Sequence, residues 1–266
     1  MKSVGCLVLL FALTLPLAAQ EKLIALTFDD GPRPYVLYGN GSPGLLDVLD
    51  RNGVKATFFL MGWRLTPGTY GDRRETRIGK TCLEGAKELH RRGHQLENHT
   101  FSHVHARAAK RQHGEAWVVG DIEKASALIQ GVTGARPRFV RPPQWVMWPE
   151  LRTKIESRGY RVMTINASDP DLIRDVNSND YLCAGSNPVN CPKPALAESV
   201  MRQIERREKK GLSAHVLVFH ELTTSTAALQ VLLPQLKARG YRFVTLNEYV
   251  KRTGFSNKPV VRAAAP

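Results

Sequence analysis

Two adjacent carboxylates, Asp29 and Asp30, stand where an apolar run ends in the sequence Thr-Phe-Asp-Asp-Gly-Pro. The run over residues 22–28 is typical of a buried strand, and the catalytic groups of α/β proteins gather beyond the carboxyl ends of such strands. Two unpaired carboxylates side by side repel each other. A metal ion bound by one of them removes that conflict and leaves the other free to act as a base. A solvated Asp-Asp-Gly-Pro turn is the alternative, and the pair alone does not exclude it.

Two histidines four residues apart, His99 and His103, follow a short run over residues 95–97. Imidazoles at positions i and i+4 can bind one cation from a single turn, which is the spacing of helical zinc motifs. Because the chain has eight histidines, a pair at this separation can also arise by chance. The histidines therefore need support from a further ligand elsewhere in the sequence.

Arg141 and His220 are further candidates for chemistry. Pro142 and Pro143 restrict the backbone after Arg141, so its side chain would be held in place. His220 ends the apolar run over residues 216–219, a position that suits an acid–base imidazole. A solvated arginine in a rigid loop and a histidine bonded to backbone are the structural alternatives.

A repeated pattern shows where the elements that carry these residues begin and end. Four amphipathic stretches close with a cation and a glycine, as helices with a left-handed glycine cap do; the glycines are Gly53, Gly93, Gly159 and Gly240. Apolar runs follow, so strands are predicted at 22–28, 55–61, 160–165, 215–220 and 241–246. Helices are predicted at 81–92, which opens with the capping box Thr81-x-x-Glu84, and at 115–130, 149–158, 195–210 and 226–239. The alternation predicts a single α/β domain over residues 21–254, as a barrel or an open sheet.

The first 20 residues have the composition of a secretory signal peptide. Lys2 precedes an apolar run over residues 4–15, and Pro16 and the pair Ala18-Ala19 follow it. An uncleaved N-terminal anchor is the alternative, although the run is short for a membrane-spanning helix. We therefore expect a secreted or periplasmic protein in which residues 1–20 are removed and residues 255–266 form a flexible tail.

The composition excludes several classes of protein. With 266 residues, 42% hydrophobic and 23% charged, the chain can bury a core and is not mainly disordered, and four cysteines are too few for a disulfide scaffold. The net charge of +14 becomes +13 without residues 1–20, because Lys2 is their only charged residue. The basic residues are scattered over many segments of an exported chain. We therefore expect no nucleic-acid partner, and an electrostatic contact with an anionic cell wall.

The polar segment over residues 169–192 is too long for an ordinary connection and is expected to be a functional surface loop. Cys183 and Cys191 bracket part of this loop. In an oxidising compartment their spacing favours a local disulfide, which leaves Cys82 as a buried helix residue.

Taken in order, these segments resemble the polysaccharide deacetylase family, carbohydrate esterase family 4. Residues 27–32 match the family's first motif in full, and residues 99–103 match its second, His-[Ser/Thr]-x-x-His. Residues 53–60 resemble its typical second strand. The resemblance covers residues 22–254 and implies a distorted (β/α) barrel, here with about seven parallel strands.

The resemblance implies a role for each candidate residue. Asp30, His99 and His103 would hold a divalent metal, with zinc the expected ion. Asp29 would be the catalytic base. Arg141 would orient that base and His220 would be the general acid; no other cofactor is implied.

Two motifs depart from the family pattern. Gln144 follows Pro143, where the family commonly has Tyr or Phe. The fourth motif, normally Asp-x-x-Asp-Trp, reads Asp-Pro-Asp-Leu at residues 169–172, one residue short and without the tryptophan. By its position in this motif, Asp171 would be the residue that pairs with Arg141. We expect these two departures to change which glycan the pocket binds more than they change the reaction.

The implied activity is metal-dependent removal of N-acetyl groups from a polysaccharide, either peptidoglycan or a chitin-like polymer, by a monomeric enzyme. A backbone N–H near Pro143–Gln144 would help to stabilise the oxyanion. Three alternatives stay open: an O-acetyl esterase acting on xylan with the same centre, a non-catalytic glycan-binding relative, and a basic structural protein that binds the cell wall.

Overall fold

The structure is a computed structural model that describes residues 20–68, 74, 78–164, 176–183, 193–254 and 260–261. Its strands are β1 (Gln20–Gly31), β2 (Thr57–Leu60), β3 (Gln95–Asn98), β4 (Phe139–Val140), β5 (Arg161–Val162), β6 (Val176–Asn177), β7 (Ala214–His220), β8 (Tyr241–Val244) and β9 (Val260–Val261). Its α-helices are α1 (Pro34–Leu37), α2 (Leu45–Arg51), α3 (Cys82–Arg91), α4 (Ala106–His113), α5 (Glu115–Thr133), α6 (Pro149–Glu156), α7 (Lys193–Glu208), α8 (Thr223–Ala238) and α9 (Leu246–Thr253). Three short 3₁₀ helices are η1 (Gly62–Leu65), η2 (Pro143–Trp145) and η3 (Asp180–Cys183).

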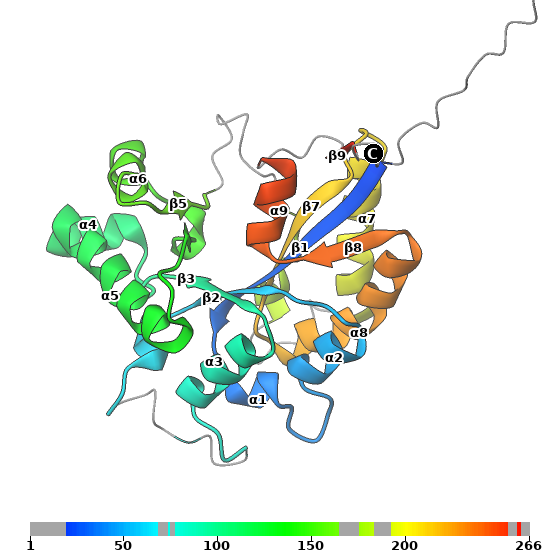
Figure 1. The fold of residues 1–266 in the computed structure, drawn as a ribbon, viewed down its shortest axis with the longest axis horizontal. Coiled ribbons are helices and arrows are strands. Elements are labelled where there is room, and N and C mark those ends of the chain that lie inside the picture. The colour runs from blue at the N-terminus through cyan, green and yellow to red at the C-terminus, as the bar shows by residue number, and fades with distance from the viewer. Residues whose placement is uncertain are drawn as a thin grey trace, which may run out of the picture.

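One curled sheet organises these elements. Seven strands follow the order β5-β4-β3-β2-β1-β7-β6, with every neighbouring pair parallel, while β8 lies parallel to the first half of β1. In Figure 1, β1 crosses the middle of the molecule, with α4, α5 and α6 at one end of the sheet and α2, α7 and α8 at the other. The α/β class and the distorted barrel of parallel strands are confirmed.

Local signals in the sequence produce the predicted element boundaries. Gly53, Gly93, Gly159 and Gly240 all have left-handed φ angles, between 59° and 89°, and lie two or three residues after the last residue of their helices. At the start of α3, the Glu84 N–H donates to Thr81 Oγ1 over 3.0 Å and the Thr81 N–H donates to Glu84 Oε2 over 2.7 Å. This is the predicted capping box.

Both faces of the central strands are buried. Along β1, Ile24, Leu26 and Phe28 join the large apolar cluster under the surrounding helices. Leu23 and Ala25 point the opposite way, into the cluster that fills the inside of the barrel. Because side chains alternate along a strand, Thr27 and Asp29 continue the inward series.

The parallel register brings the candidate residues to one end of the barrel. Asp29 of β1 is directly opposite His220 of β7. His99 follows the last residue of β3, and Arg141 follows the last residue of β4. Four separate strands therefore deliver their functional side chains to the same carboxyl edge.

The two predicted terminal segments are only partly described. Residues 1–19 lie outside the described residues, and within 255–266 only β9 is described. β9 pairs antiparallel with the start of β1, through Gln20 with Val261 and Glu21 with Val260. Among the described helices, none is both long and apolar enough to cross a membrane.

Candidate metal centre

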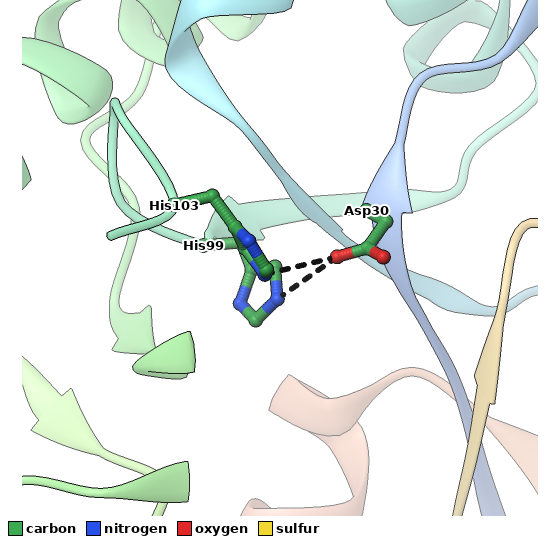
Figure 2. Close-up of side chains that lie close together, drawn as sticks. All are labelled: Asp30, His99 and His103. Carbon is green, nitrogen blue, oxygen red and sulfur yellow. Dashed lines mark ion pairs between the residues drawn. The ribbon is translucent and has the colours of Figure 1, made fainter. Parts of the chain in front are cut away.

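Three side chains from two strand ends converge on one point at the carboxyl edge. The Nε2 atoms of His99 and His103 lie 3.4 Å and 3.2 Å from Oδ1 of Asp30. All three ligand atoms lie within 4.8 Å of one another (Figure 2). The structure therefore brings His99 and His103 together with Asp30, the carboxylate that was expected to bind the same metal ion.

A hydrogen bond at its other nitrogen orients the His99 ring toward this carboxylate. Nδ1 of His99 is 2.6 Å from the carbonyl oxygen of Arg141. Since a carbonyl only accepts hydrogen bonds, Nδ1 is the donor in this contact, and Nε2 is the ring nitrogen that faces Asp30. Orientation of a histidine ligand through its other nitrogen is the usual arrangement in metal sites.

The three residues fit a divalent cation. Oδ1 of Asp30 is a buried atom that has no hydrogen-bond partner. Ligands bound to zinc at about 2.0–2.1 Å stand about 3.3 Å apart at the corners of a tetrahedron, close to the two separations seen here. Three protein ligands would leave a fourth position for water or substrate, as in catalytic zinc sites.

The charge state of Asp30 suits the same role. Burial raises its pKa, but the contacts with His103 and His99 outweigh burial and hold the pKa well below its usual range. Asp30 is therefore ionised, and its other oxygen faces the Arg33 guanidinium at 3.6 Å.

Asp29 turns away from this cluster and bonds to Arg141 instead. Nη1 of Arg141 donates to Oδ1 of Asp29 over 2.6 Å and to Oγ1 of Thr27 over 3.0 Å. Arg141 is fully buried, and Asp29 is 1% exposed. The guanidinium carbon also lies 3.9 Å from the ring centre of Phe59 and 4.4 Å from that of Trp145, so aromatic faces pack against the cation.

His220 bonds to an acidic residue that the sequence analysis did not identify. Its Nδ1 donates to Oδ1 of Asp180 over 2.7 Å, and its backbone N–H donates to Oδ2 over 2.7 Å. Ser225 Oγ donates to the same Oδ2 over 2.5 Å. Burial lowers the pKa of His220, but the bond to Asp180 and the charges of nearby carboxylates outweigh burial and raise it. His220 therefore keeps its proton at a higher pH than an ordinary histidine.

Asp180 belongs to the long loop for which a function was predicted. The described part of that loop contains β6 and η3, and Asp180 is the first residue of η3. Asp171 and Cys191 lie outside the described residues, as does the side chain of Cys183, so the partner role and the disulfide stay predictions. Among the described residues, the carboxylate that contacts Arg141 is that of Asp29.

Glu221 holds the turn that follows Asp30. The Arg33 N–H donates to its Oε2 over 2.7 Å. Gly31 is needed at this turn because a Cβ there would lie 1.7 Å from Oε1 of Glu221. Burial raises the pKa of Glu221 to about 7.

The loop that carries His99 and His103 is fixed by Asp121 of α5, another residue that the sequence analysis missed. The Phe101 N–H donates to Oδ2 of Asp121 over 3.0 Å, and the Ser102 N–H donates to Oδ1 over 3.1 Å. The loop needs this support because Thr100 and His103 have left-handed φ angles of 66° and 58°, which are costly for residues with a side chain.

Comparisons with known proteins agree with the geometry. A family model described as polysaccharide deacetylase matches residues 17–163. A peptidoglycan-N-acetylglucosamine deacetylase of Bacillus cereus is 25% identical over 236 residues, 87% of this chain and 89% of that protein. The peptidoglycan-N-acetylglucosamine deacetylase PgdA of Listeria monocytogenes is 29% identical over 236 residues, 88% of this chain but 40% of that protein. The structure of a family 4 acetyl xylan esterase from Clostridium thermocellum, in complex with a cobalt ion, is 26% identical, has a TM-score of 0.62, and covers 89% of this chain and 94% of that one.

Replacement of Asp121 should weaken metal binding without removing a ligand. We expect Asp121→Ala to lower the affinity for zinc by about 10- to 100-fold, the usual effect of losing a group that orients metal ligands. Competition with a chromophoric chelator measures this affinity. Glu123→Ala is the matched control, because Glu123 is on the same helix but bonds to Arg136 and Tyr160. Equal zinc affinity in the wild type and both variants, all folded, would contradict the role of Asp121.

Proposed function

The chain belongs to the polysaccharide deacetylase family, and we propose that it hydrolyses the N-acetyl groups of N-acetylglucosamine residues in peptidoglycan. The observation that carries this proposal is that the two adjacent carboxylates have different partners. Asp30 faces two histidines, while Asp29 is bonded to a buried arginine. A chitin-like polymer has the same acetamido group and is the second substrate that this site suits.

Asp30, His99 and His103 would hold the divalent metal, for which we propose zinc. When bound, a zinc ion supplies Lewis acidity and a water molecule of lowered pKa. Two nitrogen ligands and one carboxylate form a donor set that catalytic zinc sites use. The cobalt ion in the esterase structure is a property of that protein, and it agrees with a divalent ion in this family.

Asp29 would act as the general base. Arg141 holds one of its oxygens, which fixes the carboxylate and leaves the other oxygen to accept a proton from the attacking water. The attack places negative charge on the acetyl oxygen. A backbone N–H near Pro143–Gln144 would donate to that oxygen, next to the left-handed Gln144 with its φ of 55°.

His220 would act as the general acid. An amine leaves only after its nitrogen is protonated, and the raised pKa keeps a proton on His220 for this step. Asp29 is opposite His220 in the register, so the proposed base and the proposed acid lie on neighbouring strands. Asp171 remains a proposed contributor from the fourth motif.

An O-acetyl esterase on xylan is the second candidate function, favoured by the similarity to the acetyl xylan esterase. An alkoxide leaves more readily than an amine, so an esterase depends less on a protonated His220. The bonds that Asp180 makes to His220 therefore support the amide substrate over the ester.

We propose that the chain acts outside the cytoplasm as a monomer, after removal of residues 1–20. The charged start, apolar run and small residues of that segment support this location. Sequencing the N-terminus of the exported protein tests it, and a mature chain that still begins at Met1 would contradict it.

Acetate release from a panel of glycans tests the proposed substrate. We expect kcat/KM on peptidoglycan strands to exceed that on acetylated xylan by at least about tenfold, since the site is built to protonate an amine. N-acetylglucosamine oligomers should also react. Asp30→Ala, which lacks a metal ligand, is the control for contaminating activity. Faster release from xylan would favour the esterase, and no release from any glycan would favour a non-catalytic relative.

Replacement of Asp180 should change the pH dependence of the reaction. The negative charge of Asp180 stabilises the protonated form of His220, so Asp180→Asn should lower the pKa of His220. The alkaline limb of the kcat profile then moves to lower pH, and kcat at neutral pH falls by about 10- to 100-fold. Asp50→Asn, a change in an exposed ion pair with Arg92 and Lys55, is the control. An unmoved alkaline limb in a folded Asp180→Asn variant would contradict the assignment of His220 as the acid.

A further inference from the structure

Helix α4 carries a stripe of three exposed cations, Arg107, Lys110 and Arg111. Their spacing of three and four residues places them on the same side of the helix. Ala106 and Ala109 are buried and form the side that packs against the protein. The helix contains no acidic residue, so the stripe has no counter-charge of its own. We call these three residues the α4 stripe.

The α4 stripe differs from most of the basic surface in lacking carboxylate partners. Many other exposed cations are paired, among them Arg91 with Glu88, Arg239 with Glu205 and Glu208, and Arg252 with Glu21. In the part of the chain that the structure describes, no ion pair joins Arg107, Lys110 or Arg111 to a carboxylate. Like charges at this spacing destabilise a helix, so an external anion would relieve a local repulsion.

The α4 stripe lies beside the candidate metal centre. Arg107 is four residues after the metal-ligand candidate His103, which limits the separation of their Cα atoms to about 14 Å. Nζ of Lys110 is 4.4 Å from the centre of the Trp148 ring. Trp148 follows Trp145 closely in the chain, and Trp145 packs on Arg141. Helix α4 therefore begins three residues after His103, and its Lys110 contacts Trp148, in the segment that follows Arg141.

We propose that the α4 stripe binds carboxylate groups on the sugar rings of an acidic glycan strand while an N-acetyl group of that strand occupies the metal centre. This inference rests on the proposed function and narrows its substrate to strands with carboxylates. Charge complementarity supports it, because three cations without a carboxylate partner lie near the site on a chain with a net charge of +14. Sugar carboxylates repeat along the strand itself, so they reach this rim whenever a neighbouring residue is in the site.

The chain offers a matched control at the opposite end of the barrel. Arg206, Lys209 and Lys210 are exposed at the end of α7, shortly before the first residue of β7. They therefore lie near the amino ends of the strands, whereas the metal centre is at the carboxyl ends. In the described residues these three also form no ion pair with a carboxylate. Both clusters contribute three positive charges, and only their positions differ.

The test compares two triple variants, Arg107→Gln/Lys110→Gln/Arg111→Gln and Arg206→Gln/Lys209→Gln/Lys210→Gln. The substrates are peptidoglycan strands without stem peptides, in which the sugar carboxylates are free, and the same strands with these carboxylates amidated. At low salt we expect the α4 variant to raise KM for the carboxylated strands by about tenfold, with kcat within about twofold of wild type. The α7 variant should match wild type, and amidation or high salt should remove the difference.

Binding to the same strands, measured by co-sedimentation, separates this inference from the proposed function. If no acetate is released but the α4 variant alone binds carboxylated strands more weakly, the proposed function is wrong. The role of the α4 stripe in binding these strands is then still supported. Equal weakening in both variants would overturn the inference, because total charge and not position would then matter. An effect that persists on amidated strands, or that requires stem peptides, would overturn it too. Equally strong α4-dependent binding of duplex DNA would assign the stripe to nucleic acid.

Discussion

The opposite orientation of two neighbouring carboxylates is the arrangement on which the rest of the site depends. Asp29 continues the inward alternation of β1 and bonds to Arg141 inside the barrel. Asp30 leaves the strand geometry with a φ of 68°, and its side chain faces the two histidines. Asp29 is therefore paired with the Arg141 guanidinium, whereas Asp30 faces the two histidines and the Arg33 guanidinium, so the two carboxylates have separate partners. The backbone conformation at Asp30 is costly, and such conformations persist only where the surroundings fix them.

The remaining structure can be understood as support for this division. Arg141 is a fully buried cation, which a protein interior tolerates only with a close anion and good packing. Asp29 supplies the anion, and Phe59 and Trp145 supply the packing. The carbonyl of Arg141 in turn contacts Nδ1 of His99, so Arg141 connects Asp29 with the cluster of Asp30 and the two histidines. A change at Arg141 would therefore affect both.

The sequence was sufficient to predict the parallel α/β fold and the residues that meet at its carboxyl edge. Asp29 and Asp30 follow an apolar run directly, and His99 and His103 are close in the chain, so their patterns are local. Asp180 and Asp121 could not be found in this way. Asp180 reaches His220 across 40 residues, and Asp121 reaches the histidine loop from the middle of a helix, so only the packing of distant segments reveals them. The bond between Arg141 and Asp29 agrees with the role implied by the family resemblance, in which the arginine orients the base. The expected partner Asp171 lies outside the described residues and stays a prediction.

Acetate release by Asp29→Asn, with the metal content of the same sample determined, tests directly whether the two carboxylates have separate roles. We predict that the variant retains one bound divalent ion per chain, because Asp30, His99 and His103 are unchanged. We also predict that kcat on peptidoglycan strands falls by at least about 100-fold, the usual loss when a general base is removed. Full activity with the metal retained would contradict the assignment of Asp29 as the base. Loss of the metal would show that the two carboxylates do not divide their roles.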